Sequence, residues 1–308
     1  MKRRLIAALL TLSAVAACGD SAAGTAPDGK PAVVTAFYPL QFLSERIGGD
    51  QVSVSTLTKP GAEPHDVELN PQQVGQISDA ALVVYLSGFQ PAVDKAVEQE
   101  AKDRAFDAGT AVDLLPIAPH DEQSDVPGEE HEEAAGGKDP HVWLDPVRFA
   151  TITDRLGERL ATVDPAHAAD HRARAATVHT ELNALNEEFA TGLKTCARRE
   201  IVTSHTAFNY LAQRYGLTEV GITGISPEAE PSPQRLAEVA AEARSTGATT
   251  IFFETLVSPK VAETIAREVG AKTAVLDPLE GLTAPGSDYF SVMRANLAAL
   301  TKALGCTP

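Results

Sequence analysis

Short apolar runs and helically spaced apolar residues alternate along both halves of the chain. In the first half, candidate strands lie at 33–37, 52–57 and 81–86, with helical patterns at about 40–48 and 71–79. The second half repeats the scheme, with candidate strands at 201–203, 219–222, 249–253 and 273–276. Strands that alternate with helices form parallel sheets with helices on both faces. The pattern therefore predicts an α/β protein with two parallel sheets.

Several helix starts are marked by a capping residue followed by proline. The pairs are Asn70-Pro71, Asp145-Pro146, Asp164-Pro165, Ser232-Pro233 and Ser258-Pro259. Asn, Asp and Ser side chains accept hydrogen bonds from free backbone N–H groups, and proline at the first helical position lacks an N–H that would have no intrahelical partner. We expect a helix to begin at each pair.

A long helical segment lies between the two halves. Over 165–193 the only glycine or proline after the first position is Gly192, and Leu182, Leu185 and Phe189 fall on one face. About 28 helical residues span roughly 40 Å. We expect this segment to join two lobes as a stiff connector, with little lobe-to-lobe opening.

The N-terminal residues are typical of an export signal. A basic start at 1–4 precedes an apolar run at 5–14 that is too short to span a bilayer, and small residues lead to Cys18. This predicts a signal peptide, 1–17, with a segment that resembles a bacterial lipobox, in which Cys18 is lipidated. A plain signal peptide with an incidental Cys18 is the alternative. We expect a protein outside the cytoplasm, lipid-anchored to the outer face of a bacterial cell membrane.

These patterns divide the rest of the chain. The predicted parts are a flexible linker at 18–31, an N-terminal lobe at 32–164, the connecting helix at 165–194 and a C-terminal lobe at 195–308. Within the first lobe, 119–140 is acidic and rich in glycine, with His120 and His131. This segment is either a solvated insertion or a loop that captures metal ions over a nearby site.

Charge and cysteines narrow the class of protein. The formal net charge of −16 argues against nucleic-acid binding, which needs basic patches. Cys196 and Cys306 remain after Cys18, and outside the cytoplasm such a pair predicts a disulfide. In the loop-entropy description this link contributes roughly 4–5 kcal/mol. Two free thiols or a metal-binding pair are the alternatives.

Four candidate metal ligands sit beside strands or helix starts. His65 follows the second strand, His141 precedes a helix, and His205 and Asp277 each follow a strand directly. Ligands bind outside the carboxyl ends of parallel strands, so these loops converge if the two sheets face each other. Three imidazoles and one carboxylate form the set that tetrahedral zinc prefers, whereas Mg²⁺ and Ca²⁺ require more oxygens.

Nearby carboxylates are candidates for orienting the second nitrogen of each histidine. The candidates are Asp66, Asp139 and Glu254. Glu254 either has this orienting role or competes with Asp277 as the fourth ligand. The remaining histidines on the long helix are expected on a solvated face: His167, His171 and His179.

Five ordered motifs between about residue 33 and the C-terminus resemble one family. They are Ala62–Glu68, Asp139–Pro146, Ser204–Tyr210, Pro227–Pro233 and Asp277–Gly281. The family is the metal-specific solute-binding proteins of ABC transporters, of the ZnuA/TroA type. The resemblance implies two (β/α)4 lobes joined by one long rigid helix, with the metal in the interlobe cleft. It also carries metal ligation onto residues of this chain, namely His65, His141, His205 and Asp277.

The resemblance implies a monomer without catalytic activity that captures Zn²⁺ and delivers it to an ABC permease. Manganese and iron members usually have a carboxylate at the third ligand position, so His205 favours zinc. A manganese- or iron-binding member remains an alternative, followed by a surface adhesin and a zinc hydrolase. The sequence shows no His-Glu-x-x-His run, and four protein ligands leave no position for a catalytic water.

Overall fold

The computed structural model describes residues 24–117, 137–282 and 286–307. The predicted signal peptide, the lipidation of Cys18 and the loop histidines His120 and His131 lie outside the described residues. Within the described part, no helix combines the length and the apolar character needed to cross a membrane.

Two four-stranded parallel sheets form the centre of the molecule. The first contains β1 (Ala32–Thr35), β2 (Ser53–Thr56), β3 (Leu82–Tyr85) and β4 (Ala105–Asp107), in the order β2-β1-β3-β4. The second contains β5 (Glu200–Thr203), β6 (Thr218–Gly221), β7 (Thr250–Phe253) and β8 (Lys272–Val275), in the order β6-β5-β7-β8. Every strand pair is parallel. The predicted α/β class is confirmed, although the apolar pattern had missed the three-residue strand β4.

Helices cover both sheets. They are α1 (Tyr38–Gly48), α2 (Pro71–Asp79), α3 (Pro91–Glu100), α4 (Pro146–Val163), α5 (Ala168–Gly192), α6 (Asn209–Tyr215), α7 (Pro233–Thr246), α8 (Lys260–Val269) and α9 (Tyr289–Leu304). Asn70, Asp145 and Ser232 cap α2, α4 and α7 with their side chains, as predicted. Asp164 precedes only a short 3-10 turn, and α8 begins after Pro259 without a side-chain cap.

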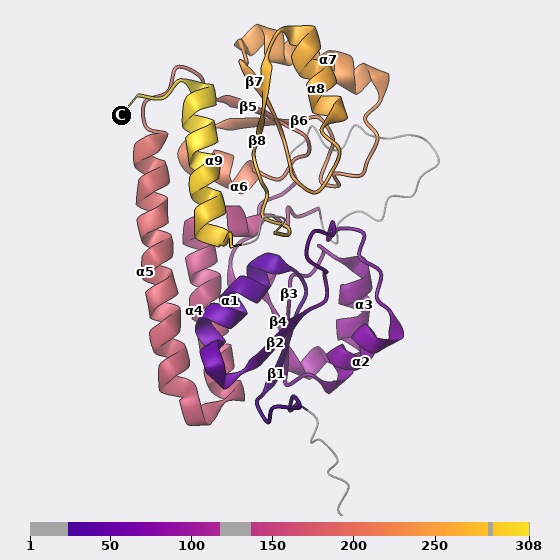
Figure 1. The fold of residues 1–308 in the computed structure, drawn as a ribbon, viewed down its shortest axis with the longest axis vertical. Helices are drawn as coiled ribbons and strands as arrows, with labels where there is room; N and C mark the ends of the chain where they lie inside the picture. The colour runs from indigo at the N-terminus through magenta and orange to yellow at the C-terminus, as the bar shows by residue number, and fades with distance from the viewer. Residues whose placement is uncertain (1–23, 118–136, 283–285, 308) are drawn as a thin grey trace, which may run out of the picture.

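The helix α5 runs along one side of the molecule past both sheets, which lie one above the other in Figure 1. It begins at Ala168, after the 3-10 turn Pro165–His167, and has 25 residues. Leu182, Leu185 and Phe189 on its inner face are fully buried. The same continuous apolar core includes residues from both sheets and from α9, so the two lobes share packed contacts in addition to the connector.

The start of the described chain packs against the first sheet. Part of the expected flexible linker forms a turn in which Thr25 pairs with Pro31. The Gly24 backbone N–H donates to the Asp79 carbonyl at 2.8 Å, and Ala32 N–H donates to the Gly24 carbonyl at 2.9 Å. The sequence predicted a flexible linker up to residue 31, and in the structure its last part, 24–31, is hydrogen-bonded next to the first sheet.

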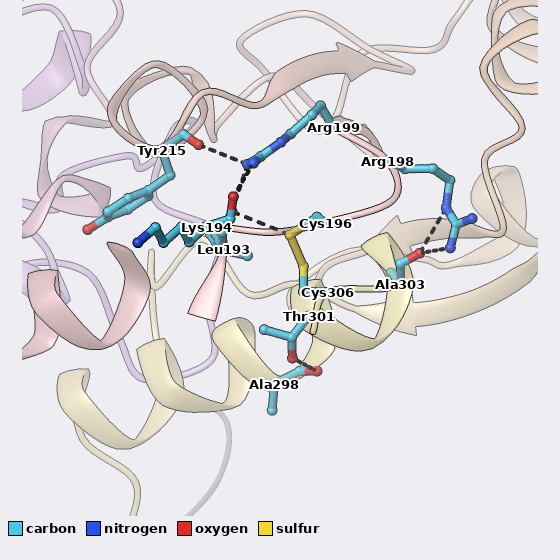
Figure 2. Close-up of a disulfide and its surroundings, with 10 residues drawn as sticks. All are labelled: Leu193, Lys194, Cys196, Arg198, Arg199, Tyr215, Ala298, Thr301, Ala303 and Cys306. Carbon is cyan, nitrogen blue, oxygen red and sulfur yellow. Dashed lines mark hydrogen bonds between the residues drawn. A yellow bond between two sulfur atoms is a disulfide. The ribbon is translucent and has the colours of Figure 1, made fainter. Parts of the chain in front are cut away.

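The predicted disulfide is confirmed. Cys196 bonds to Cys306 and ties the segment after α5 to the segment after α9, a sequence separation of 110 residues (Figure 2). The Arg198 guanidinium donates to the Ala303 carbonyl beside it at 2.9 Å. The end of the last helix is therefore fastened to the beginning of the second lobe.

Candidate metal centre

The first histidine lies in the loop after β2. The Glu63 carboxylate accepts a hydrogen bond from the His65 backbone N–H at 3.0 Å, and the Gln90 amide donates to the Pro64 carbonyl at 2.9 Å. The His65 ring meets the Phe89 ring edge to face, with centroids 4.6 Å apart. Asp66, which was predicted to orient this histidine, is exposed. The carboxylate that contacts His65 within this loop is that of Glu63, and it binds the backbone N–H.

The second histidine lies directly before the 3-10 turn Val142–Leu144 and α4. Asp139 Oδ1 lies 2.9 Å from both the backbone nitrogen and Nδ1 of His141. The Tyr210 hydroxyl donates to the Asp139 carbonyl at 2.7 Å. Asp139 therefore orients the imidazole as predicted, and a hydroxyl from the second lobe fixes its backbone.

The third histidine follows β5. Glu254, which follows β7, places Oε1 2.8 Å from His205 Nδ1, and the same oxygen accepts a hydrogen bond from the Ser204 hydroxyl at 2.8 Å. Of the two roles considered for Glu254, the structure shows the orienting one. Because Glu254 accepts at Nδ1, it leaves Nε2 of His205 directed toward the other histidines.

The three imidazoles converge on the carboxylate of Glu280. Oε1 of Glu280 lies 3.2 Å from Nε2 of His65, 3.1 Å from Nε2 of His141 and 3.2 Å from Nε2 of His205. The four candidate ligand atoms all lie within 4.8 Å of one another, and all four residues are buried. Oε2 of Glu280 has no hydrogen-bond partner within the described ranges.

These spacings fit one tetrahedral ion. Zinc bonds of about 2.0–2.1 Å place neighbouring ligand atoms of a tetrahedron roughly 3.3–3.4 Å apart. The observed nitrogen-to-oxygen distances of 3.1–3.2 Å are close to that edge length. Three edges of the ligand set thus have zinc-like length, and all four ligand atoms lie within 4.8 Å of one another, so the cluster can hold a zinc-sized cation.

Electrostatics in the cluster depend on burial and on the shared carboxylate. Burial by itself would lower the pKa of His141, but hydrogen bonds with Asp139 and Glu280 outweigh it and raise the pKa to about 9. Burial would likewise lower the pKa of His205, but the negative charges and hydrogen bonds of Glu254 and Glu280 outweigh it and raise the pKa. Burial lowers the pKa of His65, which is therefore neutral. Glu280 is also buried, but the surrounding imidazoles hold its pKa well below the usual range, so it stays ionised.

Asp277, predicted to be the fourth ligand, is not part of this cluster. Its Oδ1 accepts a hydrogen bond from the Leu279 backbone N–H at 2.8 Å, and its Oδ2 accepts one from the Thr255 hydroxyl at 3.0 Å. Both carboxylate oxygens are thus engaged within the second lobe. Glu280, three residues later in the same motif, supplies the carboxylate instead, and this corrects the sequence-based assignment.

The histidines of the connecting segment take no part in the centre. His171 is fully buried and contacts the Ile47 carbonyl and Asp164, so its expected place on a solvated face is wrong. His167 also contacts Asp164, at 2.8 Å, and His179 contacts Asp154 at 2.9 Å on the surface. The helical spacing could not show that α1 packs against the start of α5, where His171 lies.

Residues 33–303 match the sequence model of a protein family, which is described as zinc-uptake complex component A, periplasmic (ZnuA). The chain belongs to this family. The match covers both lobes, so it includes all three histidines and Glu280. It agrees with the resemblance found in the sequence motifs.

Two zinc-related bacterial proteins are similar to this chain over most of its length. The zinc-binding protein AdcA of Streptococcus pyogenes serotype M3 is 37% identical over 287 residues, which are 89% of this chain and 56% of that protein. The high-affinity zinc uptake system protein ZnuA of Bacillus subtilis is 36% identical over 94% of this chain and 93% of that protein. The chain thus spans only a little more than half the length of the streptococcal AdcA relative.

Solved structures share the fold. The laminin-binding protein Lmb of Streptococcus agalactiae superposes with a TM-score of 0.78 at 33% identity, covering 89% of this chain and 99% of that one. Zn(II)-bound AdcA of Streptococcus pneumoniae gives a TM-score of 0.75 at 35% identity, covering 90% of this chain and 58% of that one. Both solved structures therefore share the two-lobed architecture of this chain.

Proposed function

We propose that this protein captures Zn²⁺ through His65, His141, His205 and Glu280 and delivers it to an ABC permease. The observation that carries the proposal is the convergence of three imidazole Nε2 atoms on one buried carboxylate oxygen at tetrahedral spacing. Nitrogen-rich sets of this kind suit zinc, whereas Mn²⁺ and Mg²⁺ prefer oxygen-rich sites. The relatives that are named as zinc-binding and zinc-uptake proteins support the same cargo.

Capture follows from the preorganised side chains. Asp139 and Glu254 accept hydrogen bonds at Nδ1 of their histidines, which leaves each Nε2 lone pair for the ion. The raised pKa values of His141 and His205 favour their protonated forms when no metal is bound, so zinc must compete with protons for these rings to take a position beside Glu280 Oε1. Four protein ligands complete a tetrahedron and leave no open position for an activated water, so the proposal includes no catalytic step.

Delivery requires a location outside the cytoplasm and a partner in the membrane. The apolar N-terminal segment and Cys18 support export and lipid anchoring to the outer face of a bacterial cell membrane. A relative in Streptococcus pneumoniae is named a zinc-binding lipoprotein, which supports this placement. We propose that a monomer meets the permease and releases the ion there.

Elemental analysis of the purified full chain tests the proposal. We expect one zinc ion per chain, lost on treatment with a strong chelator and restored by added Zn²⁺. Single variants H65A, H141A, H205A and E280A should each bind zinc far more weakly, whereas D277A should weaken binding less than E280A. Full zinc affinity in E280A would show that the ion binds elsewhere.

A competition titration separates zinc from its closest alternative. The three imidazole ligands predict that Mn²⁺ or Fe²⁺, added at equal concentration, leaves bound zinc in place. Displacement of zinc by equimolar Mn²⁺ would assign the protein to manganese uptake.

Surface adhesion is a second candidate function. The structurally similar Lmb is described as a bifunctional protein with adhesin and metal transporting activity. Binding of this chain to immobilised laminin, unchanged in the H65A variant, would support an adhesive role independent of the metal.

A further inference from the structure

The turn that carries Glu280 has an unusual backbone conformation. Leu279 has a φ of 62°, the single positive φ of a non-glycine residue within the described part of the chain. This left-handed region is unfavourable for a residue with a Cβ atom, and it persists only where surrounding contacts impose it. The direction of the Glu280 side chain therefore depends on whatever holds residues 277–280.

Asn296 of α9 holds the beginning of this turn. Its Oδ1 accepts a hydrogen bond from the Asp277 backbone N–H at 2.9 Å, and its Nδ2 donates to the Asp277 carbonyl at 2.7 Å. Asn296 is buried in the same helical face as Tyr289, Met293 and Leu300. A polar side chain within an apolar face is costly unless it is hydrogen-bonded, and here both ends of the amide bind one backbone unit.

Trp143 holds the middle of the turn. The indole N–H donates to the Pro278 carbonyl at 2.7 Å, and the Trp143 ring lies 5.3 Å from the His141 ring between centroids. The Tyr289 hydroxyl, one end of the same face of α9, donates to the Trp143 carbonyl at 2.7 Å. The indole thus connects the turn from the second lobe to the histidine loop of the first.

On its other side, the turn that carries Glu280 borders a cavity. The cavity has a volume of about 480 Å³, with Glu280, Gly281 and Leu282 in its wall on this side and Tyr38 and Phe42 on the other. The turn therefore has packed side chains on the side of Asn296 and Trp143 and open space on the side of the cavity.

We propose that Asn296 and Trp143 are positioning residues that place Glu280 as the fourth zinc ligand. Neither side chain contacts the ion. Together they impose the left-handed conformation of Leu279 and thereby fix the carboxylate at the open vertex of the three imidazoles. The inference rests on the proposed zinc function and adds residues that set how tightly the ion is held.

The test measures zinc dissociation from the full chain by stopped-flow mixing with a chelator. The variant N296D keeps the acceptor for Asp277 N–H but turns the amide donor into a carboxylate, and W143F keeps an aromatic ring without the N–H. We expect each to release zinc about 10–100-fold faster than the unmodified protein, because loss of a group that orients a metal ligand lowers metal affinity by about this factor and changes in affinity appear mostly in the dissociation rate. T249A, which removes a hydrogen bond to the far end of α9 at Ala303, is the matched control and should release zinc at the normal rate.

A double-mutant cycle with E280A decides between positioning and general destabilisation. If Asn296 acts through Glu280, N296D has little further effect on zinc affinity in the E280A background. Full additivity of the two changes, or an unchanged dissociation rate in a folded W143F variant, would overturn the inference. Absence of zinc binding by the unmodified protein would instead overturn the proposed function, and the inference would fall with it.

Discussion

At the scale of single residues, two carboxylates outside the ligand set orient the imidazole rings of His141 and His205. Asp139 and Glu254 are both buried, and each contacts Nδ1 of one imidazole at 2.8–2.9 Å. A carboxylate at Nδ1 fixes the tautomer and the ring orientation and makes Nε2 a stronger donor to a metal. These two residues should therefore affect zinc binding without contacting zinc.

The variants D139N and E254Q should each lower zinc affinity about 10–100-fold, because the amide that replaces the carboxylate holds Nδ1–H less strongly. Competition with a chelator of known affinity measures the change. D154N is the matched control, since Asp154 contacts Nδ1 of His179 in the same way on the surface. An equal loss in D154N would show that the effect is not specific to the centre.

The pH dependence of zinc affinity follows from the protons that the histidines hold. Hydrogen bonds to carboxylates overcome the effect of burial and raise the pKa of His141 from 6.5 to about 9, and that of His205 is also raised. Zinc must displace these protons, so affinity should rise steadily from pH 6.5 to about pH 9. Titrations at several pH values measure this, and a flat affinity between pH 7 and pH 9 would contradict the assigned protonation.

The metal-free protein should show the opposite trend in stability. Groups with a raised pKa in the folded state stabilise it fully below the unfolded-state value of 6.5, and this contribution is lost as the pH rises through about 9. Glu280 has a lowered pKa and contributes stability above its ordinary value of 4.5, which is lost as the pH falls below that value. Urea unfolding of the chelator-treated protein should therefore show lower stability at pH 9 than at pH 6.5.

At the scale of elements, Asp145 joins the start of α4 to the second lobe. Its carboxylate accepts a hydrogen bond from the Val147 backbone N–H at 3.0 Å and caps the helix. It also binds the guanidinium groups of Arg148, at 2.6 Å, and of Arg214 in α6, at 2.5 Å and 2.7 Å. One buried side chain thus holds α4 directly after the loop that carries His141.

The variant D145A should lower the free energy of unfolding by roughly 3 kcal/mol, because it removes a helix cap and leaves two guanidinium groups without their carboxylate. Urea denaturation of the metal-free protein measures the loss. E268Q, which breaks the exposed pair of Glu268 and Arg244, is the control and should change stability very little. Equal effects of the two variants would show that Asp145 has no special role.

At the scale of the whole molecule, the two lobes form one packed body. A continuous apolar core extends from the first sheet through α5 and α9 into the second lobe, while a smaller core lies between the second sheet and α7 and α8. The disulfide fastens the C-terminal end of α9, and Asn296 in the middle of the same helix contacts the Glu280 turn at Asp277. The contacts between the two lobes are therefore not limited to the connecting helix.

The double variant C196S/C306S should lower the free energy of unfolding by roughly 4–5 kcal/mol, because the bond closes a loop of 110 residues in the unfolded chain. Urea denaturation measures this loss. Zinc affinity at a temperature where the variant is folded should stay within about twofold of the normal value, since the bond lies away from the site. A large loss of affinity would show that the disulfide helps to hold the turn.

The sequence by itself determined the α/β class, the long connector, the disulfide and the three histidines of the cluster. These features depend on residue type, on periodicity and on position relative to strand ends, all of which can be read along the chain. The motif Asp277–Gly281 also contained both candidate carboxylates. The three-residue strand β4 was missed because so short a run has no recognisable period.

Only the tertiary structure decided which carboxylate enters the centre. The Glu280 carboxylate follows Leu279, whose conformation is left-handed, in a turn that Trp143 and Asn296, far away in the sequence, contact at Pro278 and Asp277. The burial of His171 was decided in the same way, by the packing of α1 against the start of α5. A side chain's direction at a turn is set by backbone dihedral angles, and distant contacts can select dihedral angles that local preference disfavours.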